Sequence, residues 1–74
     1  MGIIPILAAT TEKLSDKASF FHVLGCSIYR DQSGQHFAVS EKIPEWLYSG
    51  TMVYESDQIP SHWILVKGKQ QSDS

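Results

Sequence analysis

Two hydrophobic runs flank a polar turn within Ser19–Glu41, near the middle of the chain. The turn, Asp31–Gly34, consists of residue types that favour tight turns, so the pattern predicts a β-hairpin. Arg30 and Gln35 are expected to close a four-residue loop. The register that follows pairs residues across the hairpin: Ile28 with Phe37, Cys26 with Val39, Tyr29 with His36, and Ser27 with Ala38.

A polar and charged segment, Thr10–Ala18, precedes the hairpin and predicts a short helix with a threonine as its N-cap. Apolar residues at helical spacing continue as far as Gly25, so a longer helix that ends at this glycine is an alternative. We favour a strand that begins at Ser19, because the aromatic and β-branched residues that follow are strand-favouring types.

The remaining apolar segments predict further short elements. These are an edge strand at Ile3–Leu7, a helical turn at Ser40–Gly50, and strands at Thr51–Glu55 and His62–Lys67. The predicted fold class is therefore α+β and mostly β, a small antiparallel sheet or an SH3-like or OB-like barrel of four to five strands with one or two short helices. Residues 1–67 are expected to form a single domain, followed by a polar tail at 68–74.

The composition is that of a folded domain without disulfide cross-links. Hydrophobic residues make up 42% of the 74 residues and charged residues 19%, which is too apolar for a disordered chain. The single cysteine, Cys26, allows no intramolecular disulfide and fits a reducing compartment, so we predict a cytoplasmic protein. No apolar run approaches the length of roughly 20 residues that a transmembrane helix needs, and no membrane association is expected.

The charge is uneven along the chain. Residues 31–61 contain five carboxylates and one lysine, a net charge of −4, whereas residues 1–30 and 62–74 each carry +1. Binding to a phosphate backbone requires clustered lysine and arginine, so the middle of the chain is better suited to a basic partner.

Four large aromatic residues lie among these acidic residues: Trp46, Tyr48, Tyr54 and Trp63. Tryptophan and tyrosine combine a large rigid contact area with a polar tip, and they are frequent in interaction hot spots. Core burial is the stronger expectation for the two tryptophans, whereas exposure is as reasonable as burial for the two tyrosines. The predicted partner-binding residues are Glu45, Trp46, Tyr48, Tyr54, Glu55 and Asp57.

Catalytic chemistry has little support in the sequence. In the predicted register, Cys26 and His36 point to opposite faces of the hairpin, so they do not form a nucleophile and base pair. His22 and Cys26 have suitable spacing for two metal ligands, but a metal site needs more. We therefore predict no catalytic residues, no metal site and no cofactor.

These observations predict a non-enzymatic protein–protein interaction module, a small regulator, inhibitor or accessory subunit that docks on a larger partner with a basic surface. One alternative is a nucleic-acid-binding β-barrel that uses a strand at Phe20–Arg30. Another is a homo-oligomer, with a homodimer formed by Ile3–Leu7 pairing across the dimer axis.

Overall fold

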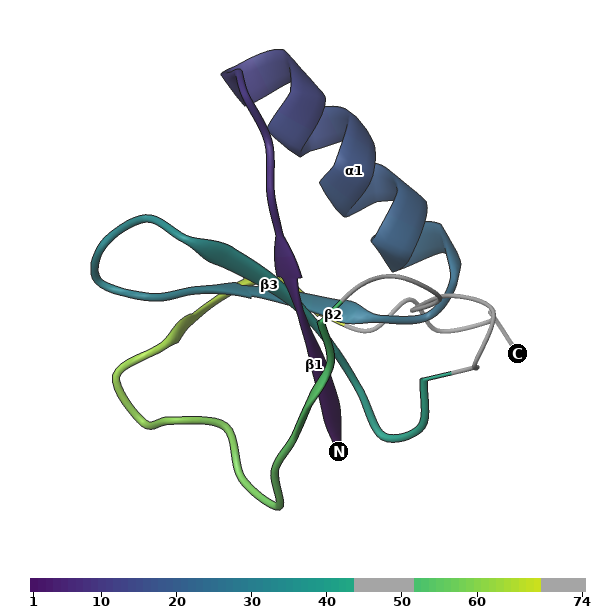
Figure 1. Cartoon of the computed structure of the whole chain (residues 1–74), viewed down its shortest axis with the longest axis vertical. Helices are drawn as coiled ribbons and strands as arrows, with labels where there is room; N and C mark the ends of the chain where they lie inside the picture. Colours follow the sequence, from purple (N-terminus) through teal and green to yellow (C-terminus); the bar gives the residue numbers. More distant parts are fainter. Residues whose placement is uncertain (44–51, 69–74) are drawn as a thin grey trace.

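The computed structural model describes residues 1–43 and 52–68 (Figure 1). Its elements are β1 (Gly2–Ile6), α1 (Thr11–Val23), β2 (Ser27–Arg30), β3 (His36–Ser40), β4 (Tyr54–Glu55) and β5 (Ile64–Lys67). The strands form one antiparallel sheet in the order β4-β1-β3-β2-β5. One helix with a five-stranded antiparallel sheet confirms the predicted small α+β fold. Closure into a barrel is not established by this strand order.

The helix is longer than the sequence analysis favoured. Thr10 caps its N-terminus in an extended conformation, and its hydroxyl accepts a hydrogen bond of 3.1 Å from the Lys13 N–H. At the C-terminus Gly25 has a φ of +95°, its N–H donates to His22, and the Cys26 N–H donates to Phe21. These two bonds form a Schellman motif. The predicted strand from Ser19 was therefore wrong, and the alternative helix that ends at Gly25 is correct.

The hairpin is present, but its register differs by one residue from the prediction. The Asp31 N–H donates to the Gln35 carbonyl at 3.0 Å, and Gly34 takes a φ of +93°. This geometry is a type I turn followed by a left-handed glycine, a three-residue loop rather than a four-residue one. The observed pairs are Ser27 with Val39, Ile28 with Ala38, Tyr29 with Phe37, and Arg30 with His36. Since one residue of slip exchanges the faces of a strand relative to its partner, Phe37 lies on the opposite face from Ile28.

The N-terminal strand β1 is an inner strand, which corrects its predicted position at the edge. It pairs with β3 along its whole length and with β4 at Gly2 and Ile3. Pro5 lies beyond the β4 pairing, so its missing N–H costs no hydrogen bond there. The edge that a homodimer through β1 would use is therefore partly occupied by β4.

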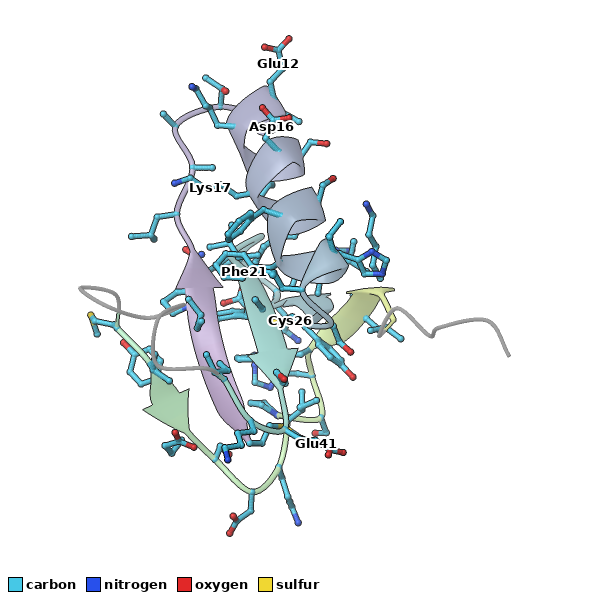
Figure 2. The ribbon with its side chains drawn as sticks, turned by 90° about the vertical axis from the view of Figure 1, so that its right-hand side faces the viewer. Glu12, Asp16, Lys17, Phe21, Cys26 and Glu41 are labelled. Carbon is cyan, nitrogen blue, oxygen red and sulfur yellow. The ribbon has the colours of Figure 1, made fainter. Side chains whose placement is uncertain are left out.

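The core lies between α1 and one face of the sheet (Figure 2). The buried residues of this cluster are Ile4, Ile6, Ala18, Cys26, Ile28, Ala38 and Ile43, and the half-buried Leu14, Phe21 and Val53 pack against them. Ile4, Ile28 and Ala38 have no exposed surface. Because strand side chains alternate between faces, these three residues share the face that α1 covers.

The second face of the sheet has its own apolar contacts. Ile3 and Val39 are buried there, and the Phe37 ring stacks on Trp63 with centroids 4.1 Å apart and planes 8° from parallel. Trp63 precedes β5 at the end of the connection from β4, and it is half-buried, in keeping with its predicted role in packing. Residues 56–63 thus link the two edge strands and supply part of the cover of this face.

The last two strands are shorter than predicted. β4 comprises Tyr54–Glu55 of the predicted strand at 51–55, and β5 comprises Ile64–Lys67 of the predicted strand at 62–67. Ser40 belongs to β3 rather than to the predicted helical turn at 40–50. Most of that turn, and the predicted tail beyond Gly68, lie outside the described residues.

Candidate functional site

Half of the predicted partner-binding site lies on β4 and in the bend that follows it, at one edge of the sheet. Tyr54 pairs with Ile3 and Glu55 with Gly2, and the Ser56 N–H donates to the Met1 carbonyl at 2.9 Å. Among residues 1–43 and 52–68, β1 is the only strand paired with β4. The outer edge of β4 therefore presents backbone groups that a further strand can pair with.

Two exposed apolar side chains accompany this edge. Tyr54 is 49% exposed and Met52 is 63% exposed. They are two residues apart and share one side of the chain, where the Tyr54 hydroxyl lies 4.0 Å from the Met52 sulfur. A tyrosine and a methionine in contact offer an adaptable apolar surface with a polar tip.

Three exposed carboxylates lie toward the same end of the sheet. Gly2 pairs with Ser40 on one side and with Glu55 on the other, so Glu41 follows one neighbour of Gly2 directly. Figure 2 shows Glu41 just beyond the end of β3. Asp57 follows in a bend, where the Ser56 hydroxyl donates to the Gln58 carbonyl at 2.7 Å.

We call Glu41, Met52, Tyr54, Glu55 and Asp57 the acidic–aromatic surface. All five are exposed, and Lys42 is the basic side chain beside Glu41. Three carboxylates against one lysine give this end of the sheet a negative charge.

The structure brings together three of the six predicted site residues: Tyr54, Glu55 and Asp57. The other three, Glu45, Trp46 and Tyr48, lie outside the described residues. Met52 and Glu41 join the surface without having been predicted as site residues. Met52 lies two residues before Tyr54, and this spacing is a local signal that could have identified Met52. Glu41 required knowledge of the pairing of β1 with both β3 and β4, which no local pattern provides.

The opposite edge of the sheet, β5, carries a second exposed surface that the sequence analysis did not identify. Ile64, Leu65 and Val66 are between 44% and 51% exposed, and Lys67 follows them. Lys67 pairs with Ile28 and Leu65 with Tyr29, so Val66 is the extra residue of a β-bulge. Three consecutive aliphatic residues at this exposure are unusual on an edge strand. We call Ile64–Lys67 the β5 edge.

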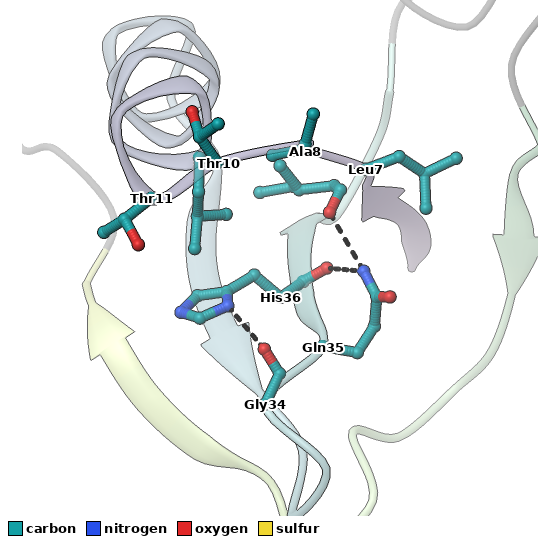
Figure 3. Close-up of a pocket in the computed structure, with 10 residues that line it drawn as sticks. Leu7, Ala8, Thr10, Thr11, Gly34, Gln35 and His36 are labelled. Carbon is teal, nitrogen blue, oxygen red and sulfur yellow. Dashed lines mark hydrogen bonds between the residues drawn. The ribbon is translucent and has the colours of Figure 1, made fainter.

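A cavity of about 610 Å³ lies between the start of α1 and the hairpin turn (Figure 3). It is lined by Ile6–Thr11, Leu14 and Gly34–His36. The Gln35 side-chain amide donates to the carbonyls of Ile6 at 2.9 Å and of His36 at 3.0 Å, and a His36 ring nitrogen lies 2.9 Å from the Gly34 carbonyl. The Gln35 amide joins the hairpin to the end of β1, and the other two contacts lie within the hairpin, so these polar groups have a positioning role.

The candidate catalytic and metal residues are not brought together. Cys26 is 2% exposed in the core, immediately before β2, and burial raises the pKa of its thiol. His36 pairs with Arg30 at the other end of the hairpin. One His22 ring nitrogen lies 2.8 Å from the Gly68 carbonyl. Within the part of the chain that the structure describes, no three His, Cys, Asp or Glu residues gather as metal ligands.

Comparison with known proteins gave no match to a family model, to a curated protein or to a solved structure. The described residues include no helix with the length and apolar character needed to cross a bilayer. The functional interpretation therefore rests on the residues and geometry of this chain.

Proposed function

We propose that this protein is a non-enzymatic interaction module, a small regulator, inhibitor or accessory subunit that binds a larger protein through the acidic–aromatic surface. The observation that carries the proposal is the position of Tyr54 and Glu55. Both are exposed on an edge strand whose outer backbone groups have no partner among the described residues. An edge of this kind binds an extended segment of another protein by adding a strand to the sheet.

The chemistry of the surface favours a basic partner. Glu41, Glu55 and Asp57 attract lysine and arginine side chains, and complementary charge raises the association rate and suppresses wrong partners. Tyr54 and Met52 supply the apolar contact that charge alone does not provide. The occupant that fits best is an extended segment in which basic residues accompany apolar ones.

The proposal is tested by affinity capture with the tagged chain from a host lysate, at low and at high salt. The double variant Tyr54→Ala, Glu55→Lys removes the tyrosine and reverses one charge of the surface. The matched control, Leu7→Ala with Asp16→Lys, makes the same kinds of change at exposed positions away from it. Both variants alter exposed side chains, so both are expected to fold.

The expected result is a basic protein that the wild type and the control retain and that the double variant loses. Equal capture by all three chains would show that the acidic–aromatic surface is not the binding site. Captured material that is sensitive to nuclease and elutes as salt rises would instead favour the nucleic-acid alternative, because phosphate contacts weaken steeply with salt.

A further inference from the structure

The two edges of the sheet carry opposite charges. The β4 edge presents Glu55, with Asp57 and Glu41 close to it in the acidic–aromatic surface. The β5 edge ends in Lys67, and Arg30 of the neighbouring strand pairs with Ile64 at its other end. Each edge also exposes apolar side chains beside its charges.

The two edge strands run in the same direction. Four antiparallel pairings separate β4 from β5 in the sheet order, and an even number of reversals restores the original direction. A second copy that continues the sheet in the same orientation therefore places its β5 parallel to β4 of the first copy.

In this parallel arrangement the charged ends of the two edges match. Residues 52–55 read Met-Val-Tyr-Glu and residues 64–67 read Ile-Leu-Val-Lys. One register sets Glu55 opposite Lys67, and both residues lie on the face of the sheet that α1 covers, because Glu55 pairs with Gly2 and Lys67 with Ile28. Tyr54 then meets the bulge at Val66, so the exposed apolar residues of the two edges lie next to each other without pairing one to one. An antiparallel arrangement over the same residues would leave Glu55 opposite Ile64.

We propose that copies of this chain associate head to tail, the β4 edge of one copy pairing in parallel with the β5 edge of the next. The second copy thereby becomes an occupant of the acidic–aromatic surface, so the inference rests on the surface used in the proposed function. A contact between two different edges closes into a ring or continues as a filament, depending on the rotation between copies. A partner with a basic strand would compete for β4 and shorten these assemblies.

Pairing of like edges is disfavoured by charge. Two β5 edges related by a two-fold axis bring Lys67 toward Arg30 of the other copy, and two β4 edges bring carboxylates together. A terminal lysine and a bulge normally keep edge strands from pairing indiscriminately. Here Glu55 of the next copy gives Lys67 a specific counterion.

Sedimentation velocity from micromolar to millimolar concentrations tests the proposal with single and double charge reversals. The wild type should form species larger than 8.3 kDa as concentration rises, and these should dissociate in high salt. Glu55→Lys and Lys67→Glu should each reduce the association constant at least tenfold. The double variant should recover it, since these residues lie on opposite edges and meet only between copies. Asp16→Lys is the control and should leave association unchanged.

A wild type that remains an 8.3 kDa monomer at millimolar concentration overturns the inference. If the single variant Lys67→Glu associates more strongly than the wild type, two β5 edges meet and the β4–β5 contact is excluded. Failure of the double variant to recover association would exclude the β4–β5 contact as well. If the chain does not self-associate but still captures a basic protein in a way that depends on Glu55, the proposed function stands and only this inference fails. Loss of both self-association and capture would show that the acidic–aromatic surface is not a binding surface.

Discussion

Replacing Gly34 by L-alanine and by D-alanine should shift the stability of the protein in opposite directions. Gly34 has a φ of +93°, and a Cβ of the L configuration built on it meets no atom within 4 Å. The cost of L-alanine is therefore one of backbone conformation, about 1–2 kcal/mol for a left-handed residue with a Cβ. A gain of roughly 0.4–1 kcal/mol from the stiffer unfolded chain offsets part of it. The net loss is about 1 kcal/mol.

This loss is large for so small a domain. At about 0.05–0.15 kcal/mol per residue, 74 residues correspond to a total stability of roughly 4–11 kcal/mol. With a urea m-value of about 1 kcal/mol per molar, L-alanine should lower the unfolding midpoint by about 1 M. D-alanine, introduced by chemical synthesis, favours positive φ and should raise the midpoint by roughly 0.4–1 M, because it keeps only the entropic gain.

The assay is urea unfolding followed by tryptophan fluorescence, which reports on the stacking of Trp63 against Phe37. Gly68→Ala is the matched control, because Gly68 also has open space for a Cβ but has no positive φ. It should leave the midpoint within the scatter of ordinary surface substitutions. A fall in the midpoint with both enantiomers at position 34 would refute the left-handed conformation and with it the three-residue turn.

Three further predictions concern local interactions. Thr10→Ala should lower the unfolding free energy by about 1 kcal/mol, whereas Thr10→Ser should preserve it, because the hydroxyl caps α1; equal losses in urea unfolding would contradict this. The pKa of Asp31 is lowered from its ordinary value by the hydrogen bond from the Ser33 side chain and, to a smaller extent, by hydrogen bonds from backbone N–H groups. The ionised Asp31 therefore stabilises the fold above pH 4, and this stabilisation is lost as pH falls. The stability advantage of the wild type over Asp31→Asn should therefore shrink between pH 7 and pH 3, and an advantage that does not change would argue against the turn hydrogen bonds. The Cys26 thiol should react with iodoacetamide at pH 8 at least 100-fold more slowly in the native protein than in urea, because it is buried and its pKa is raised; similar rates would refute its position in the core.

Local sequence patterns predicted which elements exist better than where they end. The polar segment with a threonine cap gave the start of α1, and the turn residues around Asp31 gave the hairpin. The end of α1 was mispredicted because Phe20, Phe21 and Val23 favour strands on their own. The Schellman motif at Gly25 and the packing of Phe21 on the core outweigh that preference.

The register and the strand order depend on interactions that are distant in sequence or specific to one turn. Asp31 accepts hydrogen bonds from Ser33 and Gln35, which stabilises the shorter loop and moves the register by one residue. The inner position of β1 follows from its pairing with β3 and β4, and the residues Gly2–Ile6 do not themselves indicate either partner. For the same reason, Glu55 and Asp57 could be named as site residues from the sequence, but the position of Glu41 at the same end of the sheet could not.

The position of β1 also affects how the chain folds during synthesis. β1 emerges from the ribosome before the other elements of the sheet, yet its partner β3 follows only after α1, β2 and the hairpin turn. Until then the apolar strand Gly2–Ile6 has no sheet to join, whereas α1 and the β2–β3 hairpin form from neighbouring residues. Long-range pairing of this kind slows folding and leaves hydrophobic surface exposed in the meantime. The nascent chain should thus present β1 as a chaperone-binding segment until His36–Ser40 has been synthesised and can pair with it.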